Sequence, residues 1–88
     1  MLNFKHMEKI IEQNLPQIKK LMQQYGVESA YLFGSAATGT MKDDSDVDFI
    51  IRFPEGMHYT TYSDNYFTLV DALEALLQKD VELVTEKH

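Results

Sequence analysis

The chain has 88 residues, of which 44% are hydrophobic and 11% aromatic, a composition of folded domains rather than disordered segments. Its length predicts a single domain over residues 1–88. The formal net charge of −6 argues against direct binding of nucleic acid, because proteins that grip a phosphate backbone carry basic patches. The chain contains no cysteine, which excludes disulfides and thiolate metal sites, and no apolar run of membrane-spanning length. We therefore expect a cytoplasmic protein that does not enter a membrane.

The N-terminal part of the chain has the apolar spacing of a helix. Residues on one side of that helix recur at intervals of three and four: Ile11, Leu15, Ile18 and Met22. Pro16 interrupts the pattern, because a proline inside a helix removes a hydrogen bond and clashes with the preceding turn. We expect either a kink or two short helices, with Asn14 capping the second and Gly26 ending it.

Two strand patterns follow, separated by a loop of small residues. The apolar run 30–33 (AYLF) precedes Gly34 and fits a buried strand. Residues 34–40 (GSAATGT) predict a loop or a single helical turn. Residues 46–53 (DVDFIIRF) are rich in β-branched and aromatic side chains, and Pro54 ends this second strand.

Another helix and a third strand complete the predicted fold. Residues 55–62 have the composition of a polar loop, and Ser63 can then cap a helix with a clear apolar stripe, formed by Tyr66, Leu69, Val70, Leu73, Leu76 and Leu77. Residues 81–84 (VELV) predict the third strand. The order helix, strand, strand, helix, strand indicates an α/β (α+β) domain, with helices packed on a small mixed sheet of about three strands.

Two aspartates at the start of the second strand are candidates for metal binding. Side chains alternate along a strand, so Asp46 and Asp48 project from the same face. Magnesium is commonly held by one or two carboxylates together with substrate phosphates. Taken alone, the motif is also compatible with a turn or cap at the entrance of a strand.

Gly34 and Ser35 are candidates for phosphate binding. A glycine directly after a buried strand allows close approach of the backbone to a phosphate, and the serine hydroxyl adds a donor. The spacing to Gly39 is that of a P-loop, but Thr40-Met41 stands where that loop needs a lysine and a hydroxyl. An ordinary small-residue turn is the alternative interpretation.

A calcium loop is a further alternative for the acidic segment. Asp44, Asp46, Asp48 and Glu55 have the spacing of its ligands. However, Phe49 occupies the position that requires glycine, and the segment that follows is too apolar. We exclude this interpretation.

The two motifs together resemble the signature of the polymerase-beta-like nucleotidyltransferase superfamily. Gly34-Ser35 is followed, after ten residues, by Asp46-x-Asp48, and each motif lies beside a predicted strand. Residues 32–35 (LFGS) and 45–51 (SDVDFII) are especially similar to the minimal nucleotidyltransferases that act as antitoxins beside HEPN-domain toxins. The resemblance covers the chain from the N-terminal helix to Thr85.

The resemblance implies a role for each matching position. Gly34 and Ser35 would hold a nucleoside triphosphate, and Asp46 and Asp48 would be catalytic ligands of two Mg²⁺ ions, with Mn²⁺ as a substitute. Members of the family carry a third acidic residue on a following strand. Glu82 occupies that position here.

Several positions depart from the family pattern. The third acidic residue is usually aspartate, and Asp80 is a weaker candidate than Glu82, for which a solvated strand residue is the alternative. Members often have basic residues soon after Gly-Ser, where this chain has Ala36 and Thr38. Lys42 and Arg52 are possible substitutes, although surface charges are the default interpretation of both.

The function implied by the resemblance is transfer of AMP from ATP to a tyrosine of a partner HEPN toxin, which the modification would silence. The alternative is a binding module that neutralises the toxin by docking, with a weakened catalytic site. Transfer to a small molecule ranks last, because relatives with that activity carry an additional helical domain. The sequence leaves a homo-oligomer open.

Overall fold

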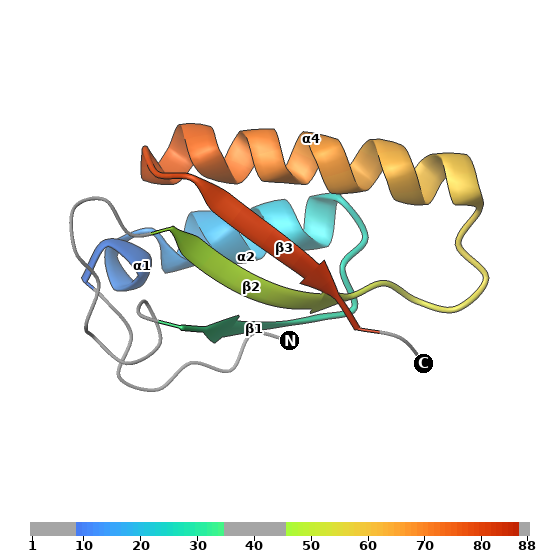
Figure 1. Cartoon of the computed structure of the whole chain (residues 1–88), viewed down its shortest axis with the longest axis horizontal. Coiled ribbons are helices and arrows are strands. Elements are labelled where there is room, and N and C mark those ends of the chain that lie inside the picture. The colour runs from blue at the N-terminus through green and yellow to red at the C-terminus, as the bar shows by residue number, and fades with distance from the viewer. Residues whose placement is uncertain (1–8, 35–45, 87–88) are drawn as a thin grey trace.

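The computed structural model describes residues 9–34 and 46–86 of the chain (Figure 1). The helices are α1 (Lys9–Gln13), α2 (Leu15–Gln24) and α4 (Tyr59–Leu77), and the strands are β1 (Ser29–Phe33), β2 (Val47–Arg52) and β3 (Val81–Thr85). The sheet has the order β1-β2-β3, with β1 antiparallel and β3 parallel to β2. This mixed three-stranded α+β fold is the one the sequence predicts. No helix in the described ranges is long and apolar enough to cross a membrane.

The N-terminal helical segment is divided in two at Asn14, as Pro16 suggests. Pro16 lies in the first turn of α2, where its missing N–H would have no partner. Asn14 stands at the N-cap position, but the prediction that its side chain caps α2 is wrong. Its Nδ2 instead donates to the carbonyl oxygen of Ile10 at 2.8 Å, so the side chain satisfies an acceptor at the end of α1.

The end of α2 is a Schellman motif built around Gly26. The Gly26 N–H donates to the Gln23 carbonyl at 3.2 Å, and the Val27 N–H donates to the Met22 carbonyl at 2.9 Å. Gly26 has a φ of +77°, a conformation that glycine adopts without strain. The chain thereby turns from α2 directly into β1.

The helix α4 begins five residues earlier than the sequence predicts. His58, not Ser63, is the N-cap, and its Nδ1 accepts from the Thr60 N–H at 3.3 Å. Tyr62 lies one turn before Tyr66 and packs edge-on against Phe53, with ring centroids 4.9 Å apart. It therefore extends the apolar stripe by one turn, a signal that the polar residues around it obscure.

The core lies between the sheet and the helices. Figure 1 shows α2 and α4 on the same side of the sheet. The side chains that face them are at most 9% exposed: Ala30 and Leu32 from β1, Val47, Phe49 and Ile51 from β2, and Val81 and Leu83 from β3. The helices contribute Ile11, Ile18, Met22, Leu69, Leu73 and Leu77 to the same core.

Two side chains of α4 cover the outer edge of β3. Tyr66 donates its hydroxyl to the Leu83 carbonyl at 2.6 Å, and Glu74 accepts from the Val81 N–H at 3.0 Å. Burial, followed by the charges of Tyr62 and Glu82, raises the pKa of Tyr66 above its ordinary value, which keeps the hydroxyl protonated as a donor. Because exposed strand edges pair with other chains, these contacts protect β3 from strand addition.

Candidate active site

The face of the sheet opposite the core carries the candidate catalytic residues. The strand register aligns its side chains in three rows that run across β1, β2 and β3. The first row is Phe33, Asp48 and Glu82; the second is Tyr31, Ile50 and Val84; and the third begins with Ser29 and Arg52. We call this surface the open face.

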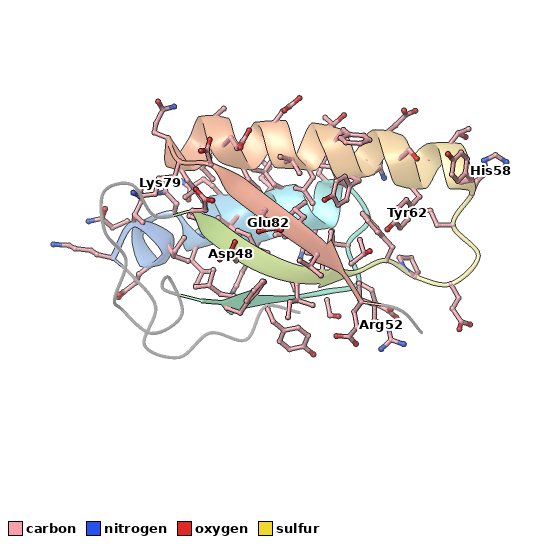
Figure 2. All side chains as sticks on the ribbon, in the orientation of Figure 1. Asp48, Arg52, His58, Tyr62, Lys79 and Glu82 are labelled. Carbon is pink, nitrogen blue, oxygen red and sulfur yellow. The ribbon has the colours of Figure 1, made fainter. Side chains whose placement is uncertain are left out.

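Asp48 and Glu82 are direct neighbours on this face. They are register partners on the parallel strands β2 and β3, so both side chains project from the same side (Figure 2). Asp48 is half-buried and Glu82 is exposed. Two carboxylates on adjacent strands form a pair of hard oxygen donors next to solvent.

Gly34 lies against Asp48 at the end of β1. A Cβ placed on Gly34 would lie only 2.9 Å from Oδ2 of Asp48, so a side chain at position 34 would displace the Asp48 carboxylate. Gly34 also has a φ of +74°, which favours glycine. The structure thus brings together Gly34 and Asp48, which are fourteen residues apart in the sequence. The phosphate-binding candidate and the metal-binding candidate therefore lie side by side.

The remaining candidates lie around this contact. Asp46 is exposed and directly precedes β2. Asp80 lies beside it, because its carbonyl oxygen accepts from the Val47 N–H at 2.8 Å. Ser35 and Lys42 lie outside the described residues. Within residues 9–34 and 46–86, no three His, Cys, Asp or Glu side chains form a group that could hold a metal ion.

The donor set nevertheless fits a hard divalent cation. Asp48 and Glu82 offer carboxylate oxygens, and the space beside Gly34 is one that a Cβ would fill. Magnesium retains several waters and is held by one or two protein carboxylates plus substrate phosphates, rather than by a cage of protein ligands. A pair of carboxylates beside an open backbone site matches this pattern.

Arg52 lies at the opposite end of β2 from Asp46. It lies four positions along the strand from Asp48, a span of about 13 Å. Its guanidinium contacts Oε2 of Glu28 at 3.7 Å and Oε1 of Glu86 at 3.9 Å (Figure 2 labels Arg52). Because acidic side chains from two neighbouring segments hold it there, the structure favours the surface-charge interpretation over a phosphate-binding role.

The prediction of a buried strand over residues 30–33 is correct for alternate residues only. Ala30 and Leu32 are buried, whereas Tyr31 is 43% exposed and Phe33 is half-buried. The apolar side chains that lie beside Asp48 on the open face were therefore not predicted from the sequence. Strand alternation could have predicted them. Tyr31 and Phe33 are at odd positions of the strand and therefore face the side opposite to Ala30 and Leu32.

Comparisons with known proteins agree with this geometry. Residues 16–88 match the model of the family described as "Polymerase beta, Nucleotidyltransferase". A solved structure of a protein provisionally classed as a minimal nucleotidyltransferase superposes with a TM-score of 0.71 and 29% identity, covering 92% of this chain and 80% of that one.

Named relatives come from two archaea. A Methanocaldococcus jannaschii protein, provisionally named a protein adenylyltransferase, is 37% identical over 78 residues, or 88% of this chain and 76% of its own. The protein adenylyltransferase MntA of Thermococcus cleftensis is 38% identical over 66 residues, or 75% of this chain and 63% of its own. The match over residues 16–88, the shared fold and these identities establish that the chain belongs to the polymerase beta nucleotidyltransferase family, whose enzymes use a nucleoside triphosphate and a divalent metal.

Proposed function

We propose that this protein transfers AMP from ATP to a tyrosine hydroxyl of a partner protein, and that the partner is a HEPN-domain toxin silenced by the modification. The observation that carries the proposal is the close approach of Gly34 to Asp48, with Glu82 as the register partner of Asp48. The names of the relatives, protein adenylyltransferases, support AMP as the transferred group and a protein as acceptor. The sequence resemblance to HEPN-associated antitoxins supports the choice of partner.

In this proposal the end of β1 binds the triphosphate. Gly34 lets the backbone approach the phosphate oxygens without steric hindrance from a Cβ. Ser35, the next residue, adds a hydroxyl donor. We assign both residues to nucleotide binding.

The carboxylates of the open face complete the site. Asp46, Asp48 and Glu82 would hold two Mg²⁺ ions, which Mn²⁺ can replace. When bound, the ions neutralise charge on the α-phosphate and on the pyrophosphate leaving group. The exposed positions of Asp46 and Glu82 leave room for the water and phosphate ligands that magnesium retains.

The transfer step exchanges one phosphorus–oxygen bond for another. The tyrosine oxygen attacks the α-phosphorus of ATP, and the bond from that phosphorus to the oxygen bridging to the β-phosphate breaks. Pyrophosphate leaves with the electron pair, and Glu82 accepts the proton of the attacking hydroxyl. Glutamate is one methylene longer than the usual aspartate, and a misplacement near 1 Å can cost about 100-fold in rate, so we expect a slow enzyme.

Single-turnover transfer of labelled AMP tests the proposal. The protein is incubated with α-phosphate-labelled ATP, magnesium and the product of the neighbouring gene, for the parent, Glu82→Gln and Glu82→Asp. We expect label on the partner with the parent, transfer that is equal or faster with Glu82→Asp, and almost none with Glu82→Gln although it still binds ATP. Equal rates for the parent and Glu82→Gln would remove Glu82 from the mechanism.

A second candidate function is neutralisation of the toxin by docking alone. It is favoured by the glutamate at position 82 and by the lack of a three-carboxylate group among the residues that the structure describes. A stable complex that acquires no label, with the parent or with Glu82→Asp, would select docking over transfer. In both cases residues 1–88 act as one domain, and we place that action in the cytoplasm.

A further inference from the structure

A group of apolar side chains lies on the open face beside the carboxylate pair. It consists of Phe33 next to Asp48, and of the second row, Tyr31, Ile50 and Val84, which is continuous across all three strands. We call these four residues the open-face patch. Its second row lies two residues along the strands from Asp48 and Glu82, a distance of about 6.6 Å.

The open-face patch lies outside the core formed by residues 9–34 and 46–86. Tyr31 is 43% and Val84 42% exposed, whereas their neighbours Leu32 and Leu83 on the opposite face are at most 9% exposed. The described helices α2 and α4 both lie on that opposite side of the sheet (Figure 1). Apolar residues aligned next to a reactive site, on the face that packs against no described helix, indicate a surface for a binding partner.

Charges surround the open-face patch in a way that specifies the partner. At one end lie Asp48 and Glu82, with Asp46 beyond them. At the other end Arg52 lies between Glu28 and Glu86, so that two carboxylates face one guanidinium. Arg52 is also the only cation within the three strands. An occupant that is apolar in its centre and basic at its ends complements this surface.

We propose that the open-face patch docks the acceptor segment of the partner protein. That segment places its tyrosine hydroxyl at the Asp48–Glu82 row, lays an apolar side chain on Tyr31, Ile50 and Val84, and presents basic residues to the flanking carboxylates. In an extended segment, the apolar side chain stands two residues from the tyrosine, because alternate residues of a strand are spaced like the rows of the sheet. The inference rests on the proposed transfer to a protein hydroxyl.

Two other occupants fit less well. A nucleotide base is read by donors and acceptors on its edge, and Ile50 and Val84 offer none at the centre of the patch. A second copy of this chain would bring two surfaces of the same negative sign together, in a protein with a formal net charge of −6. Both occupants become outcomes of the test.

Peptide binding without ATP tests the inference separately from catalysis. The probes are short peptides with one central tyrosine: the first has leucine two residues away and arginine at both ends, the second has serine for leucine, and the third has glutamate for arginine. Dissociation constants come from amide chemical-shift titrations. We expect the first peptide to bind at least about tenfold more tightly than either of the others, with shifts concentrated in β1, β2 and β3.

Substitutions on the edge strands localise the binding. Tyr31→Thr combined with Val84→Thr places threonine, which is β-branched and favours strands, at both positions and should abolish the preference for leucine. Tyr59→Thr, which removes a 78% exposed tyrosine of α4, is the matched control and should leave the preference intact. Val84→Thr alone should reduce the preference at least about threefold, and it decides the matter if the double variant does not fold.

Each alternative has its own signature. Equal binding of the three peptides, or an unchanged preference in the Val84→Thr variants, overturns the inference. If the same variants lose affinity for ATP, the patch binds the nucleotide base. If the parent sediments as a dimer and the variants as monomers, the patch binds a second copy of the chain. Transfer that fails while the peptide preference persists counts against the proposed function alone, since binding is measured without nucleotide.

Discussion

The two faces of β2 are formed by alternating residues: one face packs in the core, and the other is open to solvent and to a ligand. Val47, Phe49 and Ile51 are fully buried against the helices, whereas Asp48 and Ile50 between them are partly exposed on the open face. The buried residues are constrained by packing, and the exposed ones are free to serve a ligand. Stability and activity should therefore be separable by substitutions at adjacent positions of one strand.

The largest effect should come from removing the charge of Asp48. Asp48→Asn should lower AMP transfer at least about 1,000-fold, because stabilisation of phosphate charge by a bound metal is worth several kcal/mol and each 1.4 kcal/mol is a factor of ten. Stability should change by less than about 1 kcal/mol, since Asp48 lies outside the core. Single-turnover transfer and urea unfolding measure both quantities. Asp71→Asn, on an exposed position of α4, is the control, and a tenfold or smaller loss with Asp48→Asn would contradict the assignment.

The adjacent core residue should show the reverse. Phe49 is fully buried in the centre of the sheet, so Phe49→Ala should lower the free energy of unfolding by about 3–5 kcal/mol. Such a loss is a large part of the stability of a small domain. Phe67→Ala removes a 66% exposed aromatic side chain and should cost under about 1 kcal/mol in urea unfolding. Comparable losses in the two variants would mean that Phe49 is not central to the core.

This separation also explains which parts of the fold the sequence could predict. The strands, the division of the N-terminal helix and the turn at Gly26 follow from local chemistry: alternation, proline sterics and the left-handed conformation of glycine. The start of α4 does not, because Thr60, Thr61 and their neighbours are polar. Only the packing of Tyr62 on Phe53 shows that this turn belongs to the helix.

The candidate site was predictable as a set of residues but not as a surface. Strand alternation puts Asp46 and Asp48 on one face, the position directly after a strand marks Gly34, and the family resemblance adds Glu82. The register between strands, which aligns Glu82 with Asp48 and places Tyr31 beside Ile50, is a non-local property. Pairing partners depend on how the whole sheet assembles, so the row structure of the open face could not be read from any single segment.

Metal binding should stabilise the open face without touching the core. An ion at roughly 100 times its dissociation constant adds about 2.7 kcal/mol, so millimolar magnesium or manganese should raise the melting temperature. The combined variant Asp46→Asn, Asp48→Asn should abolish this rise. The Phe67→Ala variant, in which Asp46 and Asp48 are intact, serves as the control and should retain the rise in melting temperature. An unchanged melting curve of the parent in metal would count heavily against the site.

Alanine substitutions at two glycines with similar φ values distinguish the effect of the contact with Asp48 from the effect of backbone strain. Gly34 and Gly56 have φ values of +74° and +83°, so alanine at either position is strained by about 1–2 kcal/mol. A Cβ on Gly34 would stand 2.9 Å from Oδ2 of Asp48, whereas one on Gly56 meets no atom within 4 Å. Gly34→Ala should therefore weaken ATP binding in calorimetry, and Gly56→Ala should not. Equal ATP affinities in both variants would separate Gly34 from the nucleotide site.

The smallest effect concerns Tyr66, which joins α4 to the edge of β3. Tyr66→Phe removes the hydrogen bond to the Leu83 carbonyl and should cost about 1 kcal/mol at neutral pH. Tyr59→Phe, at a 78% exposed position, should cost less than about 0.5 kcal/mol in the same urea unfolding experiment. The small cost for Tyr66 reflects a contact that protects an edge rather than building the core.

The pH dependence of that cost tests why Tyr66 stays protonated. Burial first, and then the charges of Tyr62 and Glu82, raise its pKa in the folded protein above the ordinary value of 10.0. Below pH 10 the hydroxyl is protonated in both the folded and the unfolded chain, so its stabilising contribution is fully present. Above pH 10 the unfolded chain ionises first, and the contribution is lost as the pH rises through the raised pKa. The difference in unfolding free energy between the parent and Tyr66→Phe should thus be constant from pH 7 to about pH 9.5 and shrink above pH 10. A difference that stays constant up to about pH 11 would mean that burial on α4 does not hold the hydroxyl in its protonated form.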